Sequence, residues 1–388
     1  MNNRFFIFYD MVFRFHNGSF NTEIGGVQRY LYELSLIIKE LNYEVFVVQL
    51  GNESICSSYE GINVIQLNLT GKSKFYSAFS YIKEKYNFDN KRDVVIWGAD
   101  TISRKLPKNI KSISIQHGIA CDMVEMDSKL RKIIKNIGLI FIYKFFQRAK
   151  AINSFNNSSF KVCVDYNYLN WYRTFQKKNA DLLNNITVIP NFSKLPQVTN
   201  TSEAQEPKKI RIGFARRFVY KRGVNLMIAL SELLLEKYKN IEIVFAGDGP
   251  LKEQIIVLKN KFPQNINITS FNQDETFLFH SEIDISIVPT IGSEGTSLSL
   301  LEAMASKTAV VCTNVGGMSN IVIDNFNGFI INPDVEELFL KVSKLIEDKE
   351  LRNRLSNNAY LTVSEGFSFE LWKQKWIEVI LKVIDYEN

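Results

Sequence analysis

The sequence is short of the residues that build metal sites and disulfide frameworks. Its 388 residues include only four cysteines and three histidines, and no two cysteines form a C-x-x-C pair. This pattern argues against metal ligation or a disulfide framework, and it fits a reducing, cytoplasmic setting. No run of about 18 apolar residues is present, so we expect no transmembrane helix. The apolar run after Arg4 is short and is broken by Asp10, so we also expect no signal peptide.

A large excess of one charge is also missing. The formal net charge is +6, which permits attraction to phosphates, anionic lipid or nucleic acid and selects none of them. What is present is typical of a folded protein: 46% of the residues are hydrophobic and 23% are charged. A chain of this length predicts two domains.

Short apolar runs alternate with helical patterns along most of the chain. Such alternation predicts an α/β fold with parallel sheets. The pattern stops at 193–208, a polar stretch with two prolines, which we interpret as a linker. We therefore predict an N-terminal Rossmann-like domain at 1–192, a second such domain at 209–366 and a terminal helix within 367–388. A long loop is expected at 10–24.

The most informative feature is a pair of glutamates, Glu294 and Glu302, around a predicted strand-to-helix junction. Glu294 follows a buried strand, and Glu302 lies about one turn into the next helix. Ligands bind at the carboxyl edge of such sheets. The backbone N–H groups of Thr296, Ser297 and Leu298 would meet a phosphate at the helix N-terminus. Two carboxylates beside an anion site suggest a sugar nucleotide.

This segment resembles the E-x7-E motif of retaining GT-B glycosyltransferases, specifically glycosyltransferase family 4. The resemblance implies two Rossmann-like domains facing a central cleft, with a C-terminal helix crossing back to the first domain. It also implies that Glu302 binds the ribose hydroxyls of the nucleotide and that Glu294 contacts the transferred sugar.

Further elements of the second half resemble the same family. Arg216 and Lys221 resemble the basic pair that binds the donor diphosphate, and Arg217 is an alternative to Arg216. Ala215 departs from the usual glycine, and Arg222 separates Lys221 from the following glycine. Gly247 opens a G-x-G-P turn that resembles the family's turn beside the nucleotide.

Two elements of the first half complete the resemblance. Gly25 and Gly26 resemble a glycine-rich loop that lets the backbone approach the diphosphate. His117 ends an apolar strand and resembles a histidine near the transferred sugar. The alternative interpretation of His117 is a core histidine bonded to the backbone.

The resemblance implies a hexosyltransferase that uses a nucleotide-diphosphate sugar and a sugar acceptor. The acceptor is expected to be a lipid-linked glycan of bacterial surface polysaccharide, such as O-antigen, capsule or lipopolysaccharide. No D-x-D triplet is present, and with the basic pair this argues for transfer without a metal or other cofactor. The alternatives are a non-catalytic nucleotide-sugar or glycan-binding relative and a GT-B sugar-nucleotide epimerase. Nucleic acid is not an expected partner.

The segment 129–150 contains seven basic residues, no acidic residue and many apolar ones. A basic helix with an apolar face suits the surface of an anionic membrane. The alternative is an ordinary packed helix with basic ends. The expected location is thus cytoplasmic, with peripheral contact at the inner face of the plasma membrane.

Overall fold

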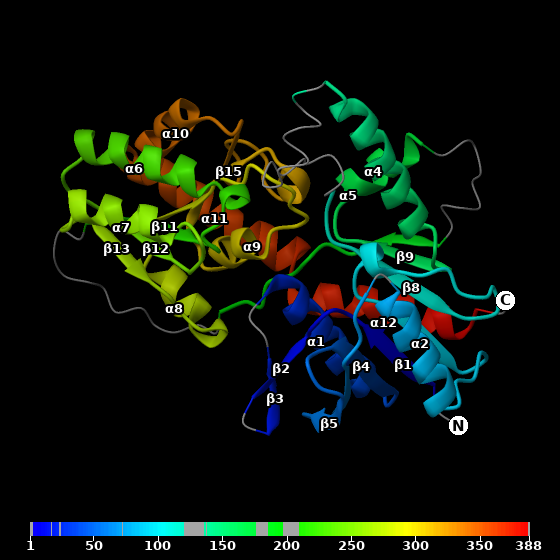
Figure 1. The fold of residues 1–388 in the computed structure, drawn as a ribbon. Coiled ribbons are helices and arrows are strands. Elements are labelled where there is room, and N and C mark those ends of the chain that lie inside the picture. The colour runs from blue at the N-terminus through cyan, green and yellow to red at the C-terminus, as the bar shows by residue number, and fades with distance from the viewer. Residues whose placement is uncertain are drawn as a thin grey trace. The chain divides into compact units, whose positions relative to one another are not determined.

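The computed structural model describes residues 3–16, 18–22, 25–71, 73–119, 136, 138–175, 185–196 and 209–386. The chain divides into two compact units, each built on its own sheet (Figure 1). Unit 1 comprises Met1–His117, Val124–Pro190 and Trp372–Asn388, and unit 2 comprises Gly118–Met123 and Asn191–Leu371. Residues 197–208 of the predicted linker, and 129–135 and 137 of the basic segment, lie outside the described residues.

Unit 1 contains an eight-stranded sheet in the order β10-β9-β8-β7-β1-β4-β6-β5. Its strands are β1 (Arg4–Phe8), β4 (Glu44–Leu50), β5 (Ile55–Tyr59), β6 (Ile62–Leu67), β7 (Asp93–Trp97), β8 (Ser112–Gln116), β9 (Phe160–Cys163) and β10 (Ile186–Val188). Its helices are α1 (Gly26–Glu40), α2 (Lys74–Lys85), η1 (Asp100–Ile102), α4 (Ile140–Phe155), α5 (Tyr166–Arg173) and most of α12 (Phe369–Ile384).

The predicted parallel sheet is confirmed, with one antiparallel strand at its edge. β5 pairs antiparallel with β6, whereas the other neighbouring strands of this sheet are parallel. The two strands are joined by Glu60 and Gly61, which have φ angles of 50° and 78°. Positive φ at both central residues is the geometry of a tight hairpin turn, so the chain reverses here without a crossover helix.

The prediction of one long loop at 10–24 is wrong in part. Residues Phe13–His16 (β2) and Ser19–Thr22 (β3) form an antiparallel hairpin. Phe13 and Phe20 are buried, and the rings of Phe15 and Phe20 pack 5.0 Å apart. The side-chain oxygen of Gln49 accepts hydrogen bonds from the N–H groups of Val12 and Phe13, and these bonds fix the start of the hairpin. Strands of four residues give too short an alternation to be recognised from sequence.

The terminal helix α12 lies within the predicted range 367–388, and it packs in unit 1 as the resemblance implies. Trp372 and Trp376 are both buried, and both rings contact the ring of Tyr30 on α1. Trp376 Nε1 donates to the Tyr30 hydroxyl at 2.9 Å. At the other end of the helix, Lys111 Nζ donates to the carbonyl of Ile384 at 2.5 Å.

Unit 2 contains a six-stranded parallel sheet in the order β13-β12-β11-β14-β15-β16. Its strands are β11 (Ile210–Ala215), β12 (Ile241–Ala246), β13 (Ile266–Thr269), β14 (Ile285–Val288), β15 (Ala309–Thr313) and β16 (Phe329–Ile331). Its helices are η3 (Tyr220–Arg222), α6 (Val224–Lys237), α7 (Lys252–Lys261), η4 (Gln273–Glu275), α8 (Thr276–Ser281), α9 (Leu298–Ala305), η5 (Gly316–Asn320), α10 (Val335–Glu347) and α11 (Lys349–Gly366).

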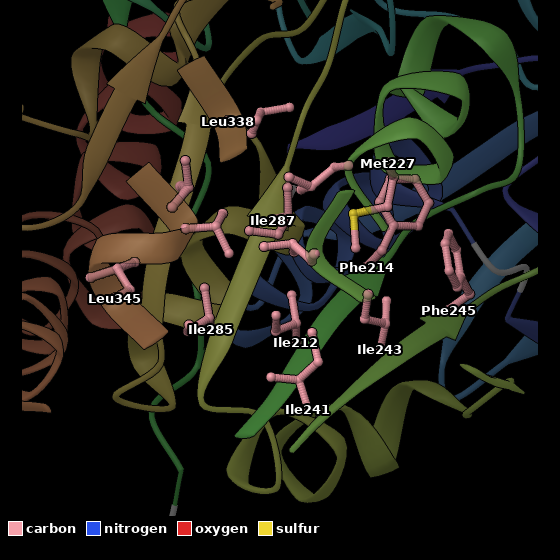
Figure 2. Packing of buried hydrophobic residues seen from close by; sticks show 14 of the residues in the cluster. Ile212, Phe214, Met227, Ile241, Ile243, Phe245, Ile285, Ile287, Leu338 and Leu345 are labelled. Carbon is pink, nitrogen blue, oxygen red and sulfur yellow. The ribbon is translucent and has the colours of Figure 1, made fainter. Parts of the chain in front are cut away.

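Helices cover both faces of this sheet. One face contributes alternate strand residues such as Ile212, Ile243 and Ile287, which pack against α6 and α10 (Figure 2). The other face contributes Val310 and Cys312, which pack against α9 and α11. Because side chains alternate between the faces of a strand, strands covered on both faces must be apolar throughout. This explains why the buried runs looked continuous in the sequence.

Candidate functional site

Two loops of unit 2 meet where the strand order reverses. β11 has β12 and β13 on one side and β14, β15 and β16 on the other, all parallel. Crossovers on the two sides leave β11 and β14 in opposite directions, and ligands of open α/β sheets bind at this point on the carboxyl edge. Arg216 directly follows β11, and Glu294 lies in the loop after β14. The fold thus brings together two residues that are 78 positions apart.

Glu294 is held by a buried ion pair. Its Oε2 atom accepts from Arg216 Nη2 at 2.5 Å, and the other terminal nitrogen of Arg216 donates to the Thr290 hydroxyl at 2.5 Å. Thr290 Oγ1 lies 3.4 Å from the same carboxylate oxygen. The side chains of Arg216 and Glu294 are 5% and 10% exposed. These contacts fix the position of the carboxylate, because hydrogen bonds to charged groups are short and directional.

A second cation reaches the same oxygen, and the sequence did not assign it a role. Arg222 Nη1 donates to Glu294 Oε2 from the end of η3. Lys221, which the sequence assigned to the diphosphate, is exposed, and so is Arg217. The backbone of Lys221 is fixed, since its carbonyl accepts from Ile291 and Gly292. In this loop, therefore, Arg216 and Arg222 donate to Glu294, and Arg217 and Lys221 are exposed residues.

The three charged groups leave the site net positive. Burial lowers the pKa of Arg216 to about 10. Burial and the neighbouring charge of Arg216 lower the pKa of Arg222 to about 9. Both guanidinium groups are still protonated at neutral pH. Two cations facing one carboxylate have one positive charge in excess, which suits an anionic ligand.

The helix α9 begins four residues after Glu294. It runs from Leu298 to Ala305, and Ser297 is its N-cap residue. Thr296 and Ser297 are buried, whereas Leu298 and Glu302 are half-buried. The Ser297 hydroxyl does not cap the helix and lies 3.3 Å from the Ser299 hydroxyl. The first-turn N–H groups therefore have no side-chain cap from Ser297, and they are the groups that an anion would bind.

Asn191 fixes the loop between Glu294 and α9 from behind. Its Nδ2 atom donates to the carbonyl of Thr296 at 2.5 Å. Asn191 is not among the predicted site residues, and its place directly after the apolar run 186–190 was the available signal. The contact orients the peptide unit that precedes Ser297, and with it the start of the helix.

Two glycines allow the loops to pack backbone to backbone. Gly247 has a φ of 146°, and a Cβ there would lie 2.2 Å from the carbonyl oxygen of Arg216. Gly316 has a φ of 59°, and a Cβ there would lie 1.8 Å from the carbonyl oxygen of Glu294. Both values are far shorter than a van der Waals contact. The turn at Gly247 thus supports the Arg216 loop, and the turn at Gly316 supports the Glu294 loop.

The remaining predicted residues lie in unit 1. Gly25 is the N-cap of α1 and Gly26 is its first residue. His117 follows β8, and its Nε2 atom is 2.9 Å from the carbonyl oxygen of Gly98. Because a carbonyl only accepts, Nε2 carries the proton and Nδ1 is the acceptor. Burial lowers the pKa of His117 to about 4, so the ring is neutral at pH 7. This backbone bond is the one that the core interpretation of His117 predicts, and it involves only Nε2.

No group of three or more His, Cys, Asp or Glu residues that would hold a metal ion occurs in the described part of the chain. None of the helices in that part is long and apolar enough to cross a membrane.

Comparison with known proteins finds a match within unit 2. Residues 198–362 match the family model "Glycosyl transferases group 1". The chain also superposes on HepE from Anabaena in complex with UDP-glucose, with a TM-score of 0.68, 13% identity and coverage of 98% and 100% of the two chains. The chain has the GT-B fold. The family match is limited to residues 198–362, and the superposition shows the fold alone.

Two curated relatives from Staphylococcus aureus give the match more detail. Poly(ribitol-phosphate) alpha-N-acetylglucosaminyltransferase is 27% identical over 218 residues, which are 53% of this chain and 42% of the relative. Capsular polysaccharide biosynthesis glycosyltransferase CapM is 26% identical over 167 residues, which are 42% of this chain and 44% of the relative. The chain thus spans less than half the length of either relative. Both are glycosyltransferases whose names refer to a polymer.

Proposed function

We propose that this protein is a retaining glycosyltransferase of family 4 that transfers a hexose from a nucleotide-diphosphate sugar to a sugar acceptor. The observation that carries the proposal is the cluster of Arg216, Arg222 and Glu294 at the carboxyl edge of the unit 2 sheet. This cluster lies within the segment that matches the glycosyltransferase family. It combines an excess positive charge with a positioned carboxylate, as a sugar diphosphate requires.

The donor would bind through its three chemical parts. The diphosphate oxygens would accept hydrogen bonds from the guanidinium groups of Arg216 and Arg222 and from the first N–H groups of α9. The ribose hydroxyls would donate to Glu302, since a carboxylate accepts two hydrogen bonds well. The hexose would contact Glu294. In unit 1, Gly25 and Gly26 at the start of α1 would let the backbone approach the diphosphate, and neutral His117 would bind a sugar hydroxyl through Nδ1.

The transfer step follows from these positions. The bond from the anomeric carbon to the diphosphate oxygen breaks, and its electron pair remains on the diphosphate. Arg216 and Arg222 stabilise that charge as it develops. The acceptor hydroxyl oxygen bonds to the anomeric carbon on the same face, and its proton passes to the departing diphosphate. Glu294 orients the sugar and forms no covalent bond to it. No metal is needed in this scheme, since the two guanidinium groups supply the positive charge.

We propose a lipid-linked glycan of bacterial surface polysaccharide as the acceptor. The support is the names of the two staphylococcal relatives, which refer to poly(ribitol-phosphate) and to capsular polysaccharide.

Donor binding can be tested without knowing the acceptor. Purified protein is screened by thermal shift and donor hydrolysis against UDP-, GDP-, ADP- and dTDP-sugars with EDTA present. We expect one nucleotide to stabilise the protein and Glu302→Ala to remove that effect. Stabilisation only after a divalent cation replaces EDTA would overturn metal-free binding. No response to any of the four, in folded protein, would favour a non-catalytic relative over the proposed enzyme.

A further inference from the structure

Arg216 is held at both terminal nitrogens of its guanidinium group. Its Nη2 atom donates to Glu294 Oε2, and its Nη1 atom donates to the hydroxyl of Thr290, each at 2.5 Å. A single hydrogen bond leaves a side chain free to turn about that bond. Because the guanidinium group is planar and its donors have a fixed geometry, a second partner on the other nitrogen sets the plane of the whole group. Thr290 therefore determines how Arg216 is oriented beside Glu294.

Thr290 lies just beyond the point where strand pairing ends. The register of β14 with β15 ends at the pair of Val288 and Cys312, two residues before Thr290. Pro289, the residue in between, has no N–H group to donate. At this point the hydroxyl of Thr313, the last residue of β15, donates to the Thr290 carbonyl at 2.5 Å. A side-chain hydrogen bond thus fixes a peptide unit that lies beyond the paired part of the strand.

Buried hydroxyl groups at these two positions indicate a polar role. Thr290 and Thr313 are both fully buried. Burying a hydroxyl group costs free energy unless it forms a hydrogen bond, and valine would fill nearly the same space without that cost. Packing alone therefore does not explain the two threonines, whereas their hydrogen bonds do. The bonds link Thr313 to Thr290 and Thr290 to Arg216, and we call the two threonines the relay.

We propose that Thr290 and Thr313 are positioning residues that hold the Arg216 guanidinium group in the orientation required by the departing diphosphate. Negative charge develops on the diphosphate during transfer, and a cation that is already in place stabilises it without reorganisation. Neither threonine is expected to touch the substrate, so each acts through Arg216. The purpose of the relay rests on the proposed function, whereas its structure rests on the two hydrogen bonds.

Hydrolysis of UDP-, GDP-, ADP- and dTDP-glucose by the full chain tests the relay. Thr313→Val should lower kcat about tenfold, because the Thr290 carbonyl loses its partner and Arg216 is less well aligned. Thr290→Val should lower kcat by about 10- to 100-fold, because it removes the partner of Arg216 Nη1. KM should change by less than about threefold in both, since the misalignment affects mainly the transition state. Thr290→Ser keeps the hydroxyl group, so its kcat should stay within about threefold of the wild type.

Thr308→Val is the matched control for Thr313→Val. Thr308 directly precedes β15 and is buried, and its hydroxyl donates to the carbonyl of His280 at 3.1 Å. Each substitution therefore removes one buried hydrogen bond from a threonine to a carbonyl. We expect both variants to have a lower Tm and only Thr313→Val to have a lower kcat. An unchanged kcat in Thr313→Val, or an equal loss of kcat in Thr308→Val, overturns the proposal.

A double-mutant cycle on stability separates this inference from the proposed function, because it needs no donor. In an Arg216→Met background the buried guanidinium group is absent. Thr290→Val should then lower Tm by at most about half as much as it does in the wild-type background. Equal falls in Tm would mean that Thr290 does not hold Arg216, and they overturn the relay itself. A wild-type protein that hydrolyses none of the four donors and shows the coupling overturns the proposed function and the catalytic purpose of the relay.

Discussion

Arg222 and Glu294 are joined by an ion pair between the end of η3 and the loop after β14. The Glu294 oxygen that accepts from Arg222 is also the one that accepts from Arg216. One carboxylate oxygen therefore positions two guanidinium groups that come from opposite ends of the same strand-to-helix connection. The carboxylate neutralises only one of the two positive charges. It can therefore hold both guanidinium groups in place while the site still attracts a diphosphate.

This arrangement predicts that two adjacent basic residues contribute differently to activity. Arg222→Ala should lower kcat/KM by about 100-fold or more, because a positioned cation is lost from the developing charge. Lys221→Ala, on the exposed side of the turn, should lower it by less than about tenfold. Donor-induced thermal shift and transfer rates measure both. A larger loss in Lys221→Ala would show that the second diphosphate ligand is the lysine, as the sequence alone predicts.

Glu294 should contribute to stability as well as to activity. Glu294→Gln removes the charge but keeps the shape, so the buried Arg216 loses its charged partner. We expect the free energy of unfolding to fall by about 1–3 kcal/mol. Urea unfolding measures this, and exposed Glu253→Gln is the control. Adding Arg222→Gln to Glu294→Gln should recover part of the loss, since the two groups interact directly. If Glu294→Gln is as stable as the wild type, the ion pair does not fix the loop.

The role of Arg222 could not be predicted from the sequence alone. The sequence places four basic residues in one loop, at 216, 217, 221 and 222, and spacing alone does not tell which of them point inward. In a 3-10 turn, adjacent residues are about 120° apart, so Lys221 and Arg222 point in different directions, and Arg222 donates to Glu294. By contrast, the terminal helix within 367–388 was predicted correctly, because the periodicity of a long apolar face is a local property. The β2–β3 hairpin was missed because a hydrogen bond to Gln49, which is distant in sequence, fixes it. Its own alternation of apolar and polar residues is too short to define it.

His280 predicts a pH dependence of stability. It is buried in α8, and no hydrogen-bond partner of either ring nitrogen is found in the described part of the chain. Burial lowers its pKa from 6.5 to about 4. The unfolded chain therefore binds this proton first, and the fold loses stability as the pH falls from about 6.5 to 4. The full loss is about 3 kcal/mol, from 1.36 kcal/mol for each pKa unit.

Replacement of His280 should flatten this dependence. The difference in unfolding free energy between pH 7.5 and pH 5 should be smaller in His280→Leu than in the wild type, because no proton is taken up at this position. Leu278→Ala, at a position of the same helix that is 65% exposed, should leave the difference unchanged. Equal slopes in His280→Leu and the wild type would mean that the buried ring is not what loses stability in acid.

Gly316 should be essential to the position of Glu294. Its φ of 59° strains any other residue, and the 1.8 Å approach of a Cβ to the Glu294 carbonyl oxygen leaves no room for alanine. Gly316→Ala must therefore displace the loop of Glu294, and we expect both a lower Tm and loss of the donor-induced thermal shift. Gly366→Ala is the matched control, because no atom lies within 4 Å of a Cβ there. A Gly316→Ala protein that keeps the wild-type Tm and donor response would show that the Glu294 loop is not fixed by this turn.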